Sequence, residues 1–282
     1  MIQVVTDSTS DVPEAVAQRL GIVVLPMIVE VDGRAYRDGV DLTRQQFYEH
    51  LPSYAKFPKT AAASPEVFAN AYRAARDAGA EAVVSIHIAR TVSGVCNAAE
   101  LAASDVAKEG ITVRVVDSGS MTIGLGWQAI AAAEMAKEGA SLDAIAEAVE
   151  AMKARIRILA MADTLRYLRK GGRVSSLTAG IGELLRIRLL IELKQGKISQ
   201  VDRVRSRSRG IQRLIEEAQK FTGQVRRFTL LYTAGSSDED LAKLRQALQP
   251  LAPIEPAEPL LITPVIGAHF GPGGLGIAIL TT

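Results

Sequence analysis

Apolar and polar positions along the first half of the chain follow two periods, one typical of buried strands and one of amphipathic helices. Short apolar runs predict strands over residues 2–5, 82–88 and 111–116. Apolar residues three or four positions apart predict helices over about 65–79, 93–108, 121–138 and 142–155. Strands that alternate with helices of this length favour right-handed βαβ units, and therefore a mostly parallel sheet with helices on both faces.

Several shorter elements are predicted between the first strand and this regular region. Asp11 and Pro13 predict the cap and the first turn of a helix. Residues 21–31 are predicted to be extended, Asp32-Gly33 predicts a hairpin turn, and Thr43 predicts the cap of a short helix. The regular alternation of strands and helices begins only after these elements.

The second half of the chain has a different rhythm. Apolar runs at 187–193 and 198–204 flank the turn Gln195-Gly196 and predict an antiparallel hairpin. The other predicted elements are strands over 156–162 and 228–233, helices near 176–185, 206–221 and 237–248, and a closing strand over 263–282. We expect two domains, an N-terminal α/β domain over residues 1–160 and a C-terminal mixed α/β domain over residues 161–282.

Hydroxyl-bearing residues cluster directly after predicted strands or before a helix. The clusters lie at residues 6–10, 60–65, 89–94 and 117–120. In an open parallel sheet, ligands bind outside the carboxyl ends of the strands. Loops rich in hydroxyls and poor in charge suit a carboxylate held by neutral donors and helix N-terminal amides. The alternative for any one of these residues is a plain helix cap. The candidate ligand contacts are Asp7, Ser8, Thr60, Ser93, Gly94 and Ser118.

The composition is that of an ordinary folded protein. The chain of 282 residues is near the size at which one hydrophobic core stops growing, and 48% of its residues are hydrophobic. It has no run of about 18 apolar residues that could span a membrane. Its first residues lack the basic segment and cleavage site of a signal peptide. We therefore expect a cytoplasmic protein without stable membrane insertion.

Positive charge is concentrated in the middle of the chain, although the net charge is only +2. Between Lys153 and Arg213, basic residues far outnumber acidic ones. Such a stretch forms either solvated faces or a docking surface for an acidic partner. Few aromatic residues accompany these charges, so the stacking platforms of a nucleic-acid binder are missing and nucleic acid is not an expected partner.

The familiar motifs of cofactor and metal sites are absent or misplaced. Residues 271–276 match the dinucleotide pattern G-x-G-x-x-G, but they precede an apolar run instead of following a strand and opening a helix. Cys96 is the only cysteine, and His50, His87 and His269 are widely spaced, so we expect no metal site and no cofactor. His269 lies among glycines that allow close approach of a ligand, and it is either a ligand contact or a structural histidine.

Several segments in a fixed order together resemble the DegV proteins, which include the fatty-acid-binding subunits (FakB type) of bacterial fatty acid kinase. The resemblance covers nearly the whole chain. The segments that carry it are residues 5–13 (Val-Thr-Asp-Ser-Thr-Ser-Asp-Val-Pro), Lys59-Thr60, Ser64-Pro65, Ser93-Gly94, residues 116–118, residues 168–175 (Leu-Arg-Lys-Gly-Gly-Arg-Val-Ser), and residues 265–273.

The resemblance implies a DegV-like fold with a long apolar tunnel between two domains. It implies that an acyl chain lies in the tunnel, that Thr60 and Ser93 hold its carboxyl group, and that His269 lies close by. A separate kinase would phosphorylate this carboxyl group to an acyl phosphate. The protein would then be an acyl carrier in phospholipid metabolism and not itself an enzyme.

The chain also departs from the pattern of that family. Ala61-Ala62-Ala63 stand where Ser-Gln-Pro is common, so Thr60, Ser93 and the Gly94 amide would hold a carboxylate with less help. Within the basic middle, the candidate residues for docking a kinase are Arg169, Lys170 and Arg173.

A hydrolase of acyl esters is the alternative function. Ser93, His269 and either Asp7 or Asp117 supply the residue types of a catalytic triad at strand ends. The sequence lacks the G-x-S-x-G elbow that normally holds such a nucleophile.

Overall fold

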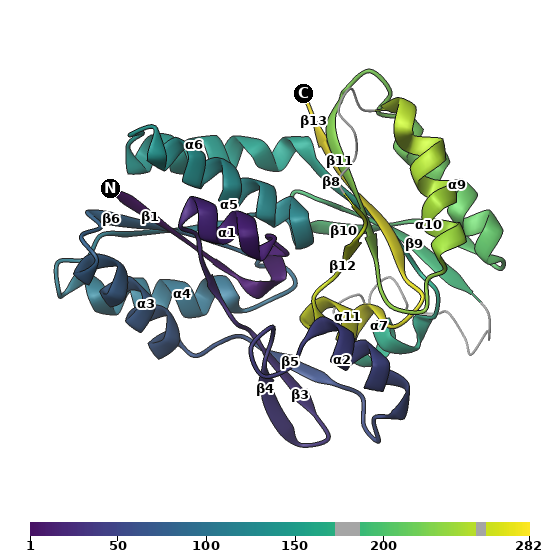
Figure 1. The fold of residues 1–282 in the computed structure, drawn as a ribbon, viewed down its shortest axis with the longest axis horizontal. Coiled ribbons are helices and arrows are strands. Elements are labelled where there is room, and N and C mark those ends of the chain that lie inside the picture. Colours follow the sequence, from purple (N-terminus) through teal and green to yellow (C-terminus); the bar gives the residue numbers. More distant parts are fainter. Residues whose placement is uncertain (173–186, 252–257) are drawn as a thin grey trace.

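The computed structural model describes residues 1–172, 187–251 and 258–282. Three sheets organise these residues (Figure 1). A parallel sheet and a mixed sheet lie side by side, each with helices packed on it, and a small third sheet projects from one end of the molecule. The predicted α/β architecture is confirmed. None of the helices in the described ranges is long and apolar enough to cross a bilayer.

The first sheet is entirely parallel, as the alternating pattern predicts. Its strands, in spatial order, are β2 (Val23–Leu25), β1 (Ile2–Asp7), β6 (Ala82–His87) and β7 (Val113–Asp117). Helices α3 (Pro65–Asp77) and α4 (Val95–Ala107) cover one face, and α1 (Glu14–Leu20), α5 (Thr122–Lys137) and α6 (Leu142–Met152) cover the other (Figure 1). Every residue of β6 is buried, as expected for a central strand between two helical layers.

The small sheet is antiparallel and carries Thr60. Its strands, in spatial order, are β4 (Arg34–Arg37), β3 (Ile28–Val31) and β5 (Lys59–Ala61). The turn at Asp32-Gly33 has positive φ at both residues, 50° and 87°, which is the hairpin geometry that this dipeptide predicts. Helix α2 (Arg44–His50) follows, and Thr43 closes a capping box with Gln46 at its start.

The second half of the chain builds a six-stranded mixed sheet. Its strands, in spatial order, are β10 (Lys197–Val204), β9 (Arg188–Lys194), β8 (Ile156–Ala162), β13 (Leu275–Thr281), β11 (Val225–Tyr232) and β12 (Leu260–Leu261). The predicted hairpin is confirmed, because β9 and β10 pair in antiparallel register around Gln195-Gly196. Helices α9 (Arg207–Gln219) and α10 (Asp238–Leu248) cover the outer face, and the inner face turns towards α5 (Figure 1).

The remaining elements are short. Helices α7 (Leu165–Gly171) and α11 (Pro264–Phe270) pack against each other at one end of the mixed sheet. The 3₁₀ turns are η1 (Ser8–Ser10), η2 (Leu51–Ser53), η3 (Lys153–Arg155) and η4 (Gln249–Leu251). The predicted helix near 176–185 lies outside the described residues. The boundary predicted near residue 160 falls inside β8, and the division into two domains stays a prediction.

Two predictions about local structure are wrong. Residues 263–282 do not form one strand, because Thr263 caps a helix that has Pro264 in its first turn, and only β13 is extended. Asp11 does not cap α1, because its backbone is left-handed (φ 51°) and its carboxylate accepts instead from the backbone amide of Thr263 and pairs with Arg44. The residue that precedes α1 is Pro13.

The tip of the β9–β10 hairpin is attached to the parallel-sheet half of the molecule. The backbone amide of Gly196 donates to the carbonyl oxygen of Gly119 over 2.7 Å, and the Thr91 hydroxyl donates to the carbonyl oxygen of Gly196. Gly119 has φ 58°, and a Cβ on it would lie 3.2 Å from the Gly196 nitrogen, so both the backbone conformation and the close approach favour glycine. The hairpin therefore bridges the two large sheets.

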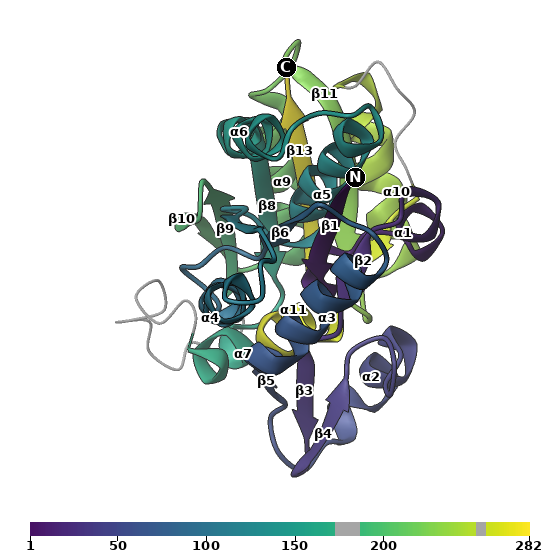
Figure 2. The same ribbon diagram turned by 90° about the vertical axis from the view of Figure 1, so that its left-hand side faces the viewer.

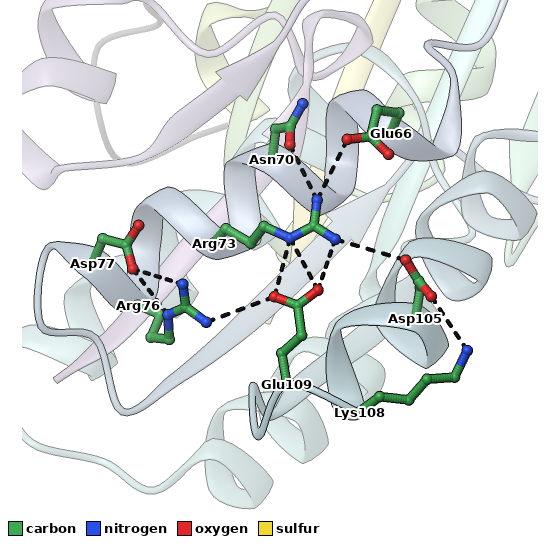
Figure 3. Close-up of polar contacts among 8 residues, drawn as sticks. All are labelled: Glu66, Asn70, Arg73, Arg76, Asp77, Asp105, Lys108 and Glu109. Atoms are coloured by element: carbon green, nitrogen blue, oxygen red, sulfur yellow. Dashed lines mark hydrogen bonds and ion pairs between the residues drawn. The ribbon is translucent and has the colours of Figure 1, made fainter.

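Exposed charges join α3 to the end of α4 (Figure 3). The guanidinium of Arg73 lies 2.7 Å from the Glu109 carboxylate, 3.4 Å from that of Glu66 and 3.7 Å from that of Asp105. Arg76 reaches Glu109 as well, over 3.7 Å. Ion pairs this exposed to water contribute little to stability individually. We therefore interpret this surface as a solvated helix face.

Candidate functional site

A largely apolar cavity of about 280 Å³ lies between the carboxyl ends of the parallel strands and the inner face of the mixed sheet. Aliphatic residues from many elements form its walls. Representative wall residues are Ile88, Val95, Ile158, Ile191, Leu193 and Leu231. No aspartate, glutamate, lysine or arginine is among its lining residues in the described part of the chain. Its volume is at the lower end of the range for small-molecule sites, and its walls suit an uncharged hydrocarbon.

Small residues form a furrow in the sheet side of this cavity. Ala160 of β8 lies opposite Gly276 of β13 and beside Ile191 of β9, while Gly276 lies beside Leu231 of β11. All four line the cavity. Ala160 and Gly276, in the centre of this row, are small, and Ile191 and Leu231 at its ends are large. The row therefore leaves room for a narrow, extended ligand across the sheet.

Thr60 and His269 meet at a polar position in the cavity wall. The Thr60 hydroxyl lies 2.7 Å from Nε2 of His269, although the two residues are far apart in sequence. Both are half-buried and both line the cavity. Thr60 is held in β5 by pairing with Val29, and His269 belongs to the last turn of α11. Of the candidates that the sequence provides, these two make direct contact.

Ser93 and Gly94 line the same cavity at the start of α4. Gly94 precedes the first helical residue, and no side chain caps this end of the helix. Helix N-terminal amides lack intrahelical acceptors and carry partial positive charge, so they favour an anionic group. The structure therefore places Thr60, Ser93, Gly94 and His269 along one cavity, with hydroxyl, amide and imidazole groups as potential donors.

Helix α11, which carries His269, is tied at its start to the N-terminal half. Thr263 donates its backbone amide to Asp11 over 3.1 Å and its hydroxyl to Asp38. Arg44 lies 2.9 Å from Asp11, and Tyr48 donates its hydroxyl to the Ile262 carbonyl over 3.2 Å. Burial raises the pKa of Asp11 to about 7, with Arg44 acting in the opposite direction, and it raises the pKa of Asp38 as well.

Glycines allow α11 to approach its neighbours closely. A Cβ on Gly267 would collide with the Tyr48 ring, and a Cβ on Gly171 would collide with the His269 imidazole. Such collisions force neighbouring groups to shift. The position of His269 therefore depends on glycine in its own helix and in the facing helix α7.

Asp7, Ser8 and Ser118 are not among the residues that line the cavity, and their side chains bond to protein groups at the strand ends. Asp7 accepts from the Thr9 amide over 3.0 Å, and Ser8 accepts from the Met27 amide over 3.2 Å. The Ser118 hydroxyl donates to the Ser120 carbonyl over 3.1 Å. Their part in ligand contact stays a prediction, and their bonds indicate support of the loops.

A buried polar chain runs from Asp7 into the parallel sheet. The Asp7 carboxylate lies 2.9 Å from Nδ1 of His87, and Nε2 of His87 lies 2.7 Å from the Ser85 hydroxyl. Asp117 accepts from the backbone amides of Arg90 and Gly119. Because neither aspartate pairs with His269 in the described structure, the arrangement of a Ser–His–Asp triad around Ser93 is not formed there.

Two of the three candidate docking residues, Arg169 and Lys170, lie at the end of α7. Arg169 and Lys170 are exposed, and the Lys170 ammonium lies 5.9 Å from the centre of the Phe57 ring. Arg173 lies outside the described residues. Leu168 of the same helix lines the cavity, so these exposed cations belong to an element of the cavity wall.

Many other cations of the basic middle are paired. Arg188 and Arg207 both contact Asp163, over 2.6 and 2.9 Å, and Arg207 also contacts Asp240. Arg213 contacts Asp202 over 2.9 Å. This pairing leaves less free positive charge on the surface than the sequence indicates.

Thr9, inside the predicted polar cluster at residues 6–10, lines the cavity, and so do Thr122, Tyr232 and Thr233, which the sequence did not single out. Thr233 directly follows β11 and accepts from the Gly274 amide over 2.7 Å. The rule that ligand sites lie at the carboxyl ends of strands pointed to this position. Nothing comparable marked Thr122, which lies inside a predicted helix.

The whole chain, residues 1–282, matches the family model described as "Uncharacterised protein, DegV family". It is 34% identical to a DegV domain-containing protein of Streptomyces coelicolor over 281 residues, which are 99% of this chain and 98% of that relative. These matches confirm the resemblance that the sequence segments indicated.

Solved structures show the same similarity. A DegV family protein from Thermus thermophilus, described with fatty acid binding, is 30% identical and has a TM-score of 0.87, with 100% of this chain and 99% of that one covered. DegV from Bacillus subtilis, described as a fatty acid binding protein, is 30% identical with a TM-score of 0.85 and the same coverage. The chain belongs to the DegV family.

Proposed function

We propose that this protein binds one long-chain fatty acid, with the acyl chain in the cavity and the carboxyl group at Thr60, Ser93, the Gly94 amide and His269. The observation that carries this proposal is an apolar cavity, free of charged lining residues where it is described, with the Thr60–His269 pair in its wall. The fatty acid binding described for the relatives from Thermus thermophilus and Bacillus subtilis supports it.

The two ends of the ligand have different roles in this proposal. Each buried CH₂ contributes about 0.8 kcal/mol, so a long acyl chain gains on the order of 10 kcal/mol before the costs of ordering. The carboxyl group gains less, because its bonds to hydroxyl and amide donors replace bonds to water. The chain therefore supplies affinity, and the polar group in the wall fixes the orientation.

We further propose that the protein is a carrier that presents the carboxyl group to a partner fatty acid kinase. Neutral donors hold a carboxylate without a fixed positive charge, and such a charge would hinder transfer of a phosphoryl group onto the carboxylate. Arg169 and Lys170, together with Arg173, are the residues we expect to contact an acidic surface of the kinase. Arg169 and Lys170 lie on α7, and this helix contributes Leu168 to the cavity wall.

Mass spectrometry of lipid extracted from the purified protein tests fatty acid binding. We expect one fatty acid per chain in the wild type and weaker retention in Thr60→Val, which keeps the side-chain shape but removes the hydroxyl. Loss of one such hydrogen bond should weaken binding about ten-fold. Absence of bound fatty acid, together with failure of the delipidated protein to bind added stearate, would falsify the proposal.

A separate measurement tests the carrier role. Charge reversal at Lys170 should weaken binding to a fatty acid kinase and leave the amount of bound lipid unchanged. Charge reversal at Lys220, which is exposed on α9's far end and paired with Glu217, is the matched control and should change neither. Loss of lipid in the Lys170 variant, with kinase binding intact, would contradict the assignment.

A further inference from the structure

Two buried carboxyl groups outside the cavity, those of Asp11 and Asp38, hold the start of α11. Asp11 is 1% and Asp38 is 4% exposed, and neither is among the residues that line the cavity. Thr263, which caps α11, donates its backbone amide to Oδ1 of Asp11 over 3.1 Å and its hydroxyl to Oδ2 of Asp38. The same hydroxyl accepts from the Val265 amide over 3.3 Å. One residue therefore ties the first turn of α11 to both acids.

Helix α11 carries any displacement of its start into the carboxyl site. Four of its seven residues line the cavity, namely Val265, Ile266, His269 and Phe270. At about 1.5 Å per residue, His269 lies roughly 9 Å along the helix from Thr263. Its Nε2 is 2.7 Å from the Thr60 hydroxyl, and a hydrogen bond of this length is lost after a small shift. Because two helical turns move as one body, the acid pair positions His269 against Thr60.

Asp38 is also connected to the small sheet that carries Thr60. Its backbone amide donates to the carbonyl oxygen of Met27 over 2.9 Å, and the Met27 amide donates to the Ser8 hydroxyl over 3.2 Å. Met27 lines the cavity and directly precedes β3, the strand that pairs with β5 at Thr60. A movement of Asp38 therefore reaches both members of the Thr60–His269 pair.

The charges around this acid pair do not balance when both acids are ionised. The charged and titratable groups that face Asp11 are Asp7, Asp38, and Arg44 and Tyr48 of α2. The Arg44 guanidinium lies 2.9 Å from Oδ1 of Asp11, while Asp7 is paired with His87. Tyr48 donates its hydroxyl to the Ile262 carbonyl and brings no charge. One guanidinium therefore opposes the two carboxyl groups that bond to Thr263.

A proton on the pair removes the excess negative charge. Oδ2 of Asp11 has no hydrogen-bond partner among the described residues, and a buried oxygen without a donor costs more when it is charged than when it is neutral. Burial raises the pKa of Asp11 to about 7, and it raises the pKa of Asp38 as well. As the pH rises through neutrality, the pair therefore loses its one proton, and two repelling carboxylates then hold the start of α11.

We propose that Asp11 and Asp38 are positioning residues of the carboxyl site: with one proton between them they hold α11 so that His269 meets Thr60, and without it they move apart and fatty acid binding weakens. This inference rests on the proposed function, since it takes the carboxyl group to lie at Thr60 and His269. Two carboxylates and one guanidinium leave one uncompensated negative charge in the interior, and separation of the carboxylates relieves it. Because Thr263 bonds to both acids, their separation breaks one of its two bonds. Affinity for a fatty acid is therefore higher below neutral pH and falls above it.

The test measures the affinity of the delipidated full-length protein for stearate between about pH 6 and 8.5, by competition with a fluorescent fatty acid. Asp11→Asn and Asp38→Asn each keep an acceptor oxygen for Thr263 and leave one carboxylate opposite Arg44, so neither variant has a proton to lose in this range. From the low to the high pH, the wild type should lose about ten-fold more affinity than either variant, the equivalent of one hydrogen bond. Titration of stearate or of His269 is common to all three proteins and cancels when their pH profiles are compared.

The outcomes separate this inference from the proposed function. Asp77→Asn, at an exposed carboxylate, is the matched control and should keep the wild-type pH profile. If both variants at the acid pair bind stearate more weakly by the same factor at every pH, the acids only support the fold and the inference is wrong. If all the profiles coincide, the inference is wrong as well, although fatty acid binding stands. If no fatty acid binds at any pH, both are wrong. If one of the two variants does not fold, the profile of the other decides in the same way.

Discussion

Replacing Asp11 with asparagine tests how the buried acid at the start of α11 affects stability. The carboxyl group is fully buried, and desolvation raises its pKa from 3.8 to about 7, with Arg44 lowering it and Asp38 and Asp7 raising it further. Between those two values the folded protein binds a proton at Asp11 that the unfolded chain does not bind. The contribution of this group to stability is therefore fully present below about pH 4 and is lost as the pH rises through about 7.

The size of this pH effect follows from the difference in bound protons between the folded and the unfolded protein. One extra bound proton changes the free energy of unfolding by about 1.4 kcal/mol per pH unit. Between pH 5 and pH 7 this amounts to roughly 2 kcal/mol, with the folded state more stable at the lower pH. Asp11→Asn should remove this slope. Asp38, whose pKa is also raised by burial, should still contribute in the same direction in both proteins.

The assay is urea unfolding of the wild type and Asp11→Asn at several pH values between about 5 and 8. The slope of the unfolding free energy against pH should differ between the two proteins by about one proton. Asp77→Asn, at a carboxylate that is 65% exposed, is the matched control and should keep the wild-type slope. Coincident slopes for wild type and Asp11→Asn would mean that Arg44 keeps Asp11 ionised in the folded protein, which would refute the reasoning from burial.

Three further predictions concern packing, the ligand and the surface. Gly267→Ala should lower the free energy of unfolding by about 1–3 kcal/mol in urea titrations, because its Cβ would collide with Tyr48; unchanged stability would show that α11 can move aside. Ala160→Leu should fill the furrow and weaken stearate binding more than binding of a short-chain acid; equal weakening of both would contradict this assignment. Arg73→Ala should cost less than about 1 kcal/mol, and added salt should shrink the difference; a large, salt-independent loss would mean that the charge network is structural.

Much of the fold could be predicted because local patterns agree with the tertiary structure. The βαβ region has buried apolar strands and clear helix signals, and the turns at Asp32-Gly33 and Gln195-Gly196 adopt the expected positive φ. The prediction of one strand over residues 263–282 was wrong for a physical reason. The apolar run before Gly267 is too short to show a helical period. Only the Thr263-Pro264 pair marks the start of α11.

The candidate site could be predicted in part. Thr60, Ser93, Gly94 and His269 were named from the sequence, and all four line one cavity. The contact between Thr60 and His269 could not be derived from the pattern, because it depends on how β5 and α11 pack. The same holds for Asp11, which looks locally like a helix cap and instead bonds to a residue near the other end of the chain.

The attachment of the β9–β10 hairpin restricts how the two halves of the molecule can move. The halves are joined by the chain where α6 leads through η3 into β8, by the bonds of Gly196 to Gly119 and Thr91, and by those of Thr263 to Asp11 and Asp38. A hinge motion turns two bodies about a few residues at one connection. Further contacts, among them the Thr60–His269 pair and the bond of Tyr48 to Ile262, also join the halves, so rotation about any single connection is opposed by the others. Widening the cavity by domain rotation would first require release of one of them, and the hairpin tip, held by two hydrogen bonds without a charged partner, is the connection that should yield first.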